Sequence, residues 1–286
     1  MANTESEIQF FERADRVRLA YALTPGRSPT AVYFCGMSTP LWDPKAMAME
    51  ALCRKRGNAS LRFDYQGRSG SSGDYDDGTL SSRLDDALSL IDNLTEGPLV
   101  LVGYSMGGWL AFLAALRRTE RLAGLLAIAP GIDFVDWIND KLSAEDIEIL
   151  HRDGRLVRTS PDYPGETWVT TLAMIQDAES HRLLNGPINI DCPVRFVHGL
   201  DDPDAPWEVS PKTADKLTSK DVEVTLLKDV GHILRDDREV ERIMAVFGDL
   251  LDVATQLIEK KTAPFDASNF KNHYTAALKA LIAEKR

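Results

Sequence analysis

Cysteine is scarce in this chain: only Cys35, Cys53 and Cys192 occur among 286 residues. An odd number at wide spacing excludes a disulfide framework and a cysteine-based zinc site. Cys35 and Cys192 lie in or beside apolar stretches, where we expect a buried thiol that packs as a small apolar group. A chain of this length can bury enough apolar surface to fold without disulfides or a structural metal.

Basic residues are also under-represented, with 33 Lys and Arg against 44 Asp and Glu and a net charge of -11. Nucleic acids and anionic membranes bind to clustered Lys and Arg, so we expect neither as a partner. No apolar run is long enough to cross a bilayer. The start of the chain, 1–7, has neither the basic and apolar segments of a secretory signal nor the Arg-rich character of a transit peptide. These absences predict a soluble, cytoplasmic protein.

Short apolar runs alternate with helical stretches along most of the sequence. Such alternation is typical of an α/β fold with a parallel sheet covered on both faces. Residues 8–23 alternate loosely and predict an antiparallel hairpin at a sheet edge. The predicted buried strands are 31–35, 60–63, 99–102, 124–129, 193–197 and 222–227, and the helices are 44–56, 80–94, 105–118, 210–217 and a long one from about 236.

The alternation is interrupted once and ends before the C-terminus. Residues 131–187 are acidic and rich in Trp, without a convincing strand, and predict a helical insertion that forms a lid over one end of the sheet. Residues 262–286 carry more Lys than acid and predict a helical appendage outside a main domain of 1–261. This tail is interpreted as a surface helix, since short basic helices are common.

The turn Gly103-Tyr104-Ser105-Met106-Gly107 is the strongest candidate for chemistry. Gly-x-Ser-x-Gly occurs by chance, and Ser105 could be a simple helix cap between two glycines. Here, however, the motif directly follows a predicted strand and precedes a predicted helix. A serine on so sharp a turn needs small residues two positions away on either side, and its hydroxyl projects at the strand end as a nucleophile.

A serine nucleophile needs a base that is oriented by an acid. Of five histidines, His232 is the one in a loop between a late strand and a helix, at the same edge of the sheet as Ser105. We interpret His198 as a structural donor, with an active-site role left open. The acid should follow the strand 193–197, where Asp201, Asp202 and Asp204 are all candidates or mere turn carboxylates.

Two backbone N–H groups should stabilise the oxyanion of the reaction. Met106, immediately after the nucleophile, is expected to provide one. Met37, in the loop after the first parallel strand, is expected to provide the other, with Gly36 allowing the tight turn. We expect no metal and no cofactor, because His and Asp do not cluster at ligand spacing.

The sequence resembles the α/β-hydrolase superfamily, in particular the branch of alpha/beta-hydrolase domain-containing protein 10. That branch comprises mitochondrial palmitoyl-protein thioesterases that also cleave acyl-glucuronides. The resemblance extends from about residue 30 to 250 and rests on 61–65, Gly67, 97–98, Gly103, 105–109, 192–193, 198–199, Asp202, 206–207 and His232. It implies a mostly parallel eight-stranded sheet and an acyl-enzyme mechanism on carboxylic esters or acyl-thioesters. The pattern His-Gly-x-x-Asp-x-x-x-Pro, common in the superfamily, selects Asp202 over Asp204 as the acid.

The substrate pocket is expected to be apolar, and four tryptophans are placed to line or flank it: Trp109, Trp137, Trp168 and Trp207. Core packing is the simpler interpretation of Trp109 and Trp168, and Trp207 is the better pocket candidate. It would accept an acyl group of a small molecule or of an acylated protein. Acidic residues between 133 and 148 could attract a cationic substrate, although a solvated helix face is the simpler interpretation.

A different class of function is a non-catalytic, hydrolase-like binding module whose tail recruits a partner. Residues 256–286 are similar to the extreme C-terminal segment of bacterial Ku, a DNA-end-binding protein. An intact triad favours the enzyme over this alternative, because a scaffold needs none of the three groups.

Overall fold

The computed structural model describes residues 6–37, 39–159 and 167–262. Its main sheet has eight strands in the order β1-β2-β4-β3-β5-β6-β9-β10. The strands are β1 (Gln9–Glu12), β2 (Arg18–Thr24), β3 (Arg27–Phe34), β4 (Asn58–Phe63), β5 (Leu99–Tyr104), β6 (Leu122–Ile128), β9 (Val194–Gly199) and β10 (Val222–Leu227). β1 and β2 are antiparallel to their neighbours, and all other pairs are parallel. The predicted eight-stranded, mostly parallel sheet and its N-terminal hairpin are confirmed.

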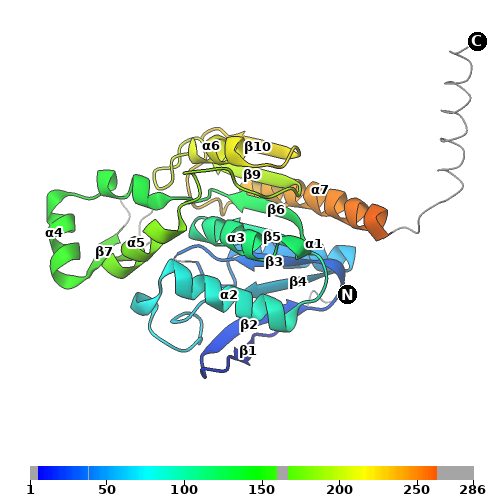
Figure 1. Cartoon of the computed structure of the whole chain (residues 1–286), viewed down its shortest axis with the longest axis horizontal. Coiled ribbons are helices and arrows are strands. Elements are labelled where there is room, and N and C mark those ends of the chain that lie inside the picture. Colours follow the sequence, from blue (N-terminus) through cyan, green and yellow to red (C-terminus); the bar gives the residue numbers. More distant parts are fainter. Residues whose placement is uncertain (1–5, 38, 160–166, 263–286) are drawn as a thin grey trace, which may run out of the picture.

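Helices cover both faces of this sheet (Figure 1). α2 and α3 pack against each other on one face, and α1 and α7 pack together on the other. Their bounds are α1 (Pro44–Arg56), α2 (Leu80–Leu94), α3 (Met106–Arg117) and α7 (Asp237–Thr262), while α6 (Val209–Lys216) lies against β10. Because of this double cover, all six residues of β5 are buried, which explains its unbroken apolar sequence.

The sequence of α1 specifies both of its ends. The Asp43 side chain caps the helix by accepting a hydrogen bond from the Lys45 backbone N–H at 2.9 Å, and Pro44 occupies the first turn. Gly57 ends the helix in a left-handed conformation with φ of 75°. The helix therefore has a fixed start, directly beside the loops that carry the candidate site.

The segment between β6 and β9 differs from the expected helical insertion. It contains the helices α4 (Ala144–Asp153) and α5 (Leu172–Ala178), but also a two-stranded antiparallel sheet of β7 (Arg155–Thr159) and β8 (Thr167–Thr171). The prediction that this segment lacks strands was wrong. Each strand has only five residues, and in β7 Leu156 is buried while the next residue, Val157, is exposed. Its two adjacent apolar residues do not alternate with polar ones in the sequence, so the strand pattern is weak there.

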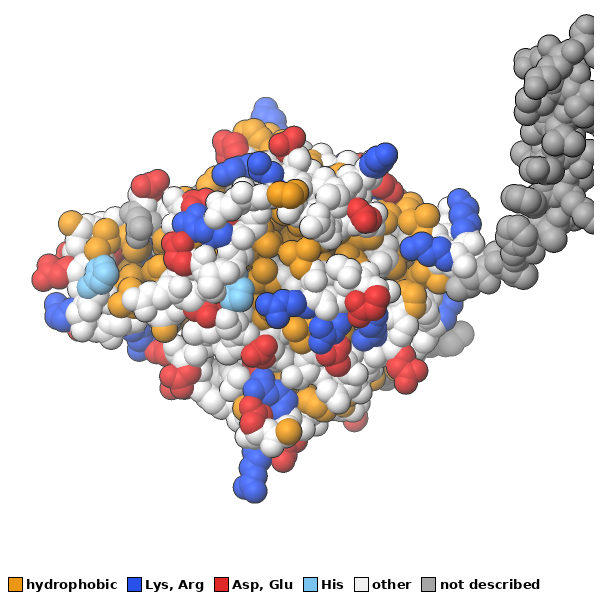
Figure 2. All heavy atoms as spheres, in the orientation of Figure 1, with side chains coloured by type: hydrophobic (Ala, Val, Ile, Leu, Met, Phe, Trp, Pro, Cys, Tyr) orange, Lys and Arg blue, Asp and Glu red, His pale blue; other side chains and the backbone are white. Residues whose placement is uncertain are grey.

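Acidic and basic side chains are interspersed over the face shown in Figure 2 rather than separated by sign. Among the described residues, none of the helices has the length and apolar character needed to cross a membrane. The predicted C-terminal appendage, apart from its first residue Thr262, lies outside the described residues.

Candidate active site

Ser105 lies between the end of β5 and the start of α3 in a strained conformation. Its φ of 55° and ψ of -122° are unfavourable for a residue with a side chain. Its N–H donates to the Ile128 carbonyl at 2.9 Å, and its carbonyl accepts from the Gly131 N–H at 3.0 Å. These bonds to the end of β6 and the residues after it hold the turn, so the surrounding structure maintains the strain that exposes the hydroxyl.

The two glycines of the motif are required by close approach of the backbone. A Cβ atom on Gly103 would lie 2.2 Å from the Gly107 carbonyl oxygen, and one on Gly107 would lie 2.1 Å from that of Phe34. Both distances are far below any real contact of a Cβ atom. The spacing of the glycines therefore reflects how tightly α3 is packed over β5 and β3.

We expect Gly107→Ala to destabilise the protein by about 3 kcal/mol or more, because the atoms that the new methyl group would meet are backbone atoms that cannot rotate away. Denaturant unfolding of the variant and the wild type measures this. Gly186→Ala is the matched control, since Gly186 has no neighbour within 4 Å of an added Cβ atom and is not in the left-handed region. If Gly107→Ala were no more destabilising than Gly186→Ala, close packing would not be the reason for Gly107.

The structure brings Ser105, His232 and Asp202 together from three separate loops. His232 Nε2 lies 2.9 Å from Ser105 Oγ, and His232 Nδ1 lies 2.7 Å from Asp202 Oδ2. A carboxylate only accepts hydrogen bonds, so Nδ1 carries the proton and Nε2 is left to accept the proton of the serine hydroxyl. The arrangement is a hydrogen-bonded chain from acid to base to hydroxyl.

Asp202 accepts several hydrogen bonds besides that of His232. His198 Nε2 lies 3.1 Å from Asp202 Oδ2, while the backbone N–H groups of Asp204 and Ala205 each donate to Oδ1 at 2.8 Å. Burial by itself raises the pKa of the Asp202 carboxyl, but the electrostatic attraction of the His232 imidazole and these hydrogen bonds outweigh it and hold the pKa well below its ordinary value. The carboxylate is thus ionised and fixed in orientation.

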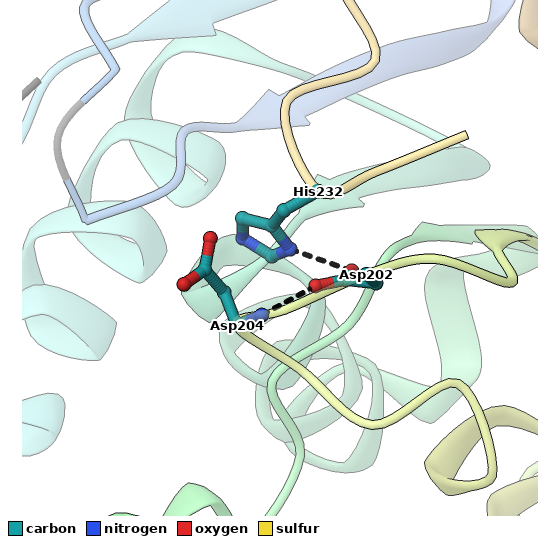
Figure 3. A group of neighbouring side chains, drawn as sticks. All are labelled: Asp202, Asp204 and His232. Atoms are coloured by element: carbon teal, nitrogen blue, oxygen red, sulfur yellow. Dashed lines mark hydrogen bonds and ion pairs between the residues drawn. The ribbon is translucent and has the colours of Figure 1, made fainter. Parts of the chain in front are cut away.

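Asp204, the second candidate for the acid, has a different place. Its backbone N–H supports Asp202, and its carboxylate approaches the imidazole of His232 from another side (Figure 3). Asp202, Asp204 and His232 each have a potential metal-ligand atom within 4.8 Å of the other two. Both nitrogens of His232 already take part in the Ser105 and Asp202 hydrogen bonds, so a metal here would compete with the triad geometry, and we assign the cluster to that geometry.

The loop with Met37 is anchored by side chains that sequence analysis did not single out. The Met37 carbonyl accepts hydrogen bonds from Arg68 Nη2 and from the Tyr75 hydroxyl, both at 2.6 Å. The Arg68 guanidinium also lies 4.2 Å from the centre of the Tyr75 ring. Met37 and Met106 both border the cavity in front of Ser105, as two oxyanion donors must.

A cavity of about 670 Å³ opens in front of the serine. One wall consists of residues at the strand ends, and the other belongs to the segment between β6 and β9, which therefore covers the site. The lining is mainly apolar, with cationic side chains at Lys141, Arg158 and Arg235. Its tryptophans are Trp42, Trp137 and Trp168.

Of the four tryptophans expected at the pocket, Trp137 and Trp168 line this cavity, whereas Trp207 and Trp109 do not and are corrected. Trp109 is fully buried in α3, packs edge-on against Phe134 and donates its indole N–H to the His181 carbonyl. It points into the core because the helix buries that face. Trp207 lies just before α6, where its carbonyl accepts from the Ser210 N–H. The tryptophans that do line the cavity come from the loop before α1 and from the insertion.

The family of the chain follows from comparison with known proteins. The model of the "Alpha/beta hydrolase family" matches residues 25–246, which include the whole hydrogen-bonded triad. The chain is an α/β-hydrolase.

Relatives of this hydrolase include palmitoyl-protein thioesterase ABHD10, mitochondrial, from Bos taurus and from Homo sapiens. The chain is 34% identical to each over 256 residues, which cover 89% of the chain and 83% of either relative. The structure of alpha/beta hydrolase domain-containing protein 10 from mouse is similar with a TM-score of 0.80 at 32% identity, over 86% of this chain and 99% of that one. Est1E from Butyrivibrio proteoclasticus with bound ferulic acid shares the fold, with a TM-score of 0.67 at 20% identity over 86% and 99% of the two chains.

A second group of Ser, His and Asp in this hydrolase has a structural role. The Ser81 hydroxyl donates to Asp177 Oδ1 at 2.7 Å and lies 2.7 Å from His181 Nε2. Because its single proton is used on Asp177, the hydroxyl accepts from His181 instead of being activated by it. The Asp177 carboxylate also accepts from the Ser81 N–H, so the group attaches α5 to the first turn of α2. His181 therefore helps to hold α5 against α2.

Proposed function

We propose that this α/β-hydrolase is a serine esterase or thioesterase that cleaves carboxylic esters or acyl-thioesters. The observation that carries the proposal is the continuous hydrogen-bonded chain from Asp202 through His232 to Ser105. The substrates named for the relatives, palmitoyl-proteins, support an acyl-thioester as one option. The cytoplasmic location stays a prediction from the sequence.

In the proposed mechanism Ser105 Oγ attacks the acyl carbonyl while His232 Nε2 takes the hydroxyl proton. The resulting oxyanion accepts hydrogen bonds from the backbone N–H groups of Met37 and Met106. His232 then gives its proton to the departing alcohol or thiol, which leaves an acyl group on Ser105. A water molecule, deprotonated by His232, releases the acid and restores the serine. Asp202 stabilises the imidazolium that forms in both steps.

The cavity supports an apolar acyl group. Trp137 and Trp168 of the insertion line the cavity, together with Phe134 and Leu142. Trp137 is held in place by its indole N–H, which lies 3.3 Å from the Asp204 carbonyl oxygen. A largely apolar cavity with few polar groups is typical of sites for hydrophobic ligands. We expect this acyl group to belong to a small molecule or to an acylated protein.

A fluorophosphonate probe tests the proposal without knowledge of the natural substrate. We expect the wild-type protein to be labelled once per chain, because the probe phosphorus captures an activated serine, and we expect Ser105→Ala to show no labelling. Mass spectrometry of the labelled peptide locates the adduct, and Ser81→Ala is the matched control because Ser81 also contacts a histidine but donates its proton to a carboxylate.

Hydrolysis of p-nitrophenyl esters and acyl-thioesters of increasing chain length then gives the substrate preference. A folded wild-type protein that the probe does not label, and that hydrolyses none of these substrates, would contradict the proposal and favour a binding module.

A further inference from the structure

Lys45 is a fully buried lysine at the start of α1, close to the site. Its Nζ lies 3.2 Å from each carboxylate oxygen of Asp43. Lysine is almost never fully buried unless it is paired, because removing its charge from water is costly. Burial lowers the pKa of the Lys45 ammonium, and the Asp43 charge opposes that effect. The capping of α1 does not explain this buried ammonium, because the Asp43 side chain caps the helix without it.

Lys45 contacts residues next to both His232 and Ser105. Its ammonium donates to the Ile233 carbonyl at 2.9 Å and lies 3.5 Å from the Leu234 carbonyl, so it holds the two residues that follow His232. It also lies 4.1 Å from the ring centre of Tyr104, the residue before Ser105. One side chain thus contacts the loop of the base and the strand end of the nucleophile.

Tyr104 also contacts the loop that carries His232. Its hydroxyl donates to the His232 carbonyl at 3.1 Å, and its ring lies 5.4 Å from the imidazole of His232. The carbonyls of three consecutive residues, 232–234, are therefore held by Tyr104 and Lys45.

The loop after His232 needs such restraint. Leu234 has a φ of 44°, in the left-handed region where a side chain costs about 1–2 kcal/mol. The residue before the base, Gly231, adds local backbone freedom. A loop with an unfavourable conformation on one side and a glycine on the other keeps its geometry only through contacts from outside.

We propose that Lys45 is a positioning residue that sets the distance between His232 and Ser105 through the carbonyls of the His232 loop and the ring of Tyr104. This inference rests on the proposed serine-hydrolase function. Proton transfer from Ser105 requires the two atoms within hydrogen-bond reach, and a displacement of about 1 Å can lower turnover by about a hundred-fold. Lys45 touches neither substrate nor reacting atoms and acts only through its neighbours.

The test is Lys45→Met, which keeps an apolar chain of similar length and removes the ammonium. We expect kcat to fall by about 10- to 100-fold with KM changed less than about three-fold, since Lys45 itself does not line the cavity. The rate constant for fluorophosphonate labelling should fall by a similar factor, which measures the reactivity of Ser105 without any substrate.

Arg62→Met is the matched control for loss of a buried cation. Arg62 is also buried, pairs with Glu50 of the same helix α1 and donates to the carbonyls of Leu41 and Ser6, and it has no hydrogen bond to the Ser105 turn or the His232 loop among the described residues. We expect it to lower the free energy of unfolding at least as much as Lys45→Met while kcat stays within about three-fold of the wild type. An equal loss of kcat in both variants would mean that general destabilisation is the cause.

The double variant Asp43→Asn with Lys45→Met separates charge pairing from positioning. If Lys45 serves only to neutralise Asp43, removing both charges restores activity. If it holds the His232 loop, the double variant regains stability but stays slow. A folded Lys45→Met protein that the probe labels at the wild-type rate would overturn the positioning role and leave the serine-hydrolase function intact, whereas an unlabelled wild type would overturn the function itself.

Discussion

Replacement of His232 by alanine is expected to lower kcat/KM for ester hydrolysis by about ten-thousand-fold or more, with the fold retained. His232 Nε2 is the acceptor at 2.9 Å from the Ser105 hydroxyl, and no other base among the described residues is hydrogen-bonded to it. Without the imidazole, the hydroxyl has to lose its proton to water, and the leaving group has to depart without a proton donor. Steady-state kinetics on a p-nitrophenyl ester, with circular dichroism to check folding, measures the effect.

The same experiment includes the Ser105→Ala variant and the double variant with His232→Ala. Residues that act as one unit are not additive, so the double variant should be no slower than the slower of the two single variants. His151→Ala is the control, because His151 is exposed on α4. Activity of His232→Ala within a few-fold of the wild type would show that another group is the base. A further large loss in the double variant would show that the two residues act separately.

The parts of this site that sequence could predict are those that local rules determine. Gly103 and Gly107 mark the turn because backbone contacts near 2 Å exclude any side chain there. The position of His232 follows from the rule that loops at the carboxyl ends of parallel strands meet at one edge. The buried strands are apolar throughout because helices cover both faces of the sheet.

The parts that sequence could not predict depend on tertiary contacts between distant segments. Arg68 and Tyr75 reach the Met37 carbonyl from the region between β4 and α2, and no motif marks them. In the sequence Lys45 is an ordinary residue in the first turn of a predicted helix. Its burial depends on how α1 packs beside the His232 loop, which no local pattern indicates. Trp109 was named as a tentative pocket residue, although its helical spacing also indicated core packing. Its contact with Phe134 of the insertion, which decides between the two, cannot be predicted from local sequence.

His198 is an intermediate case. Its place at the end of β9, four residues before Asp202, indicated a structural donor with a possible role in the site. The structure gives it a definite partner. Nε2 lies near two acceptors, Asp202 Oδ2 and the Ala205 carbonyl, while Nδ1 lies 2.8 Å from the Ser210 hydroxyl. Nε2 therefore carries the proton, and His198 helps to hold the Asp202 carboxylate in the orientation in which it also accepts from His232.

The second large effect is expected for Asp202→Asn, which should lower kcat by about ten-thousand-fold. The side-chain amide that replaces one carboxylate oxygen is a donor. If it faces His232 Nδ1, it favours the tautomer in which Nε2 carries the proton and cannot accept from Ser105. Asp204→Asn is the matched control. It keeps the backbone N–H that donates to Asp202, so we expect a loss of less than about ten-fold. The reverse order of the two effects would identify Asp204 as the acid.

The pH dependence of stability gives an independent check on Asp202. Its folded-state pKa lies below the unfolded value of about 3.9. A lowered carboxyl pKa contributes stability that is fully present above the unfolded pKa and is lost as the pH falls from there towards the folded pKa. Asp202→Asn lacks this contribution. The difference in unfolding free energy between wild type and variant should therefore be constant near neutral pH and shrink as the pH is lowered below about 3.9. Denaturant unfolding at pH 7 and pH 3 measures it. A difference that stayed the same at both pH values would mean that the Asp202 charge does not stabilise the folded protein, and that its role is confined to orienting His232.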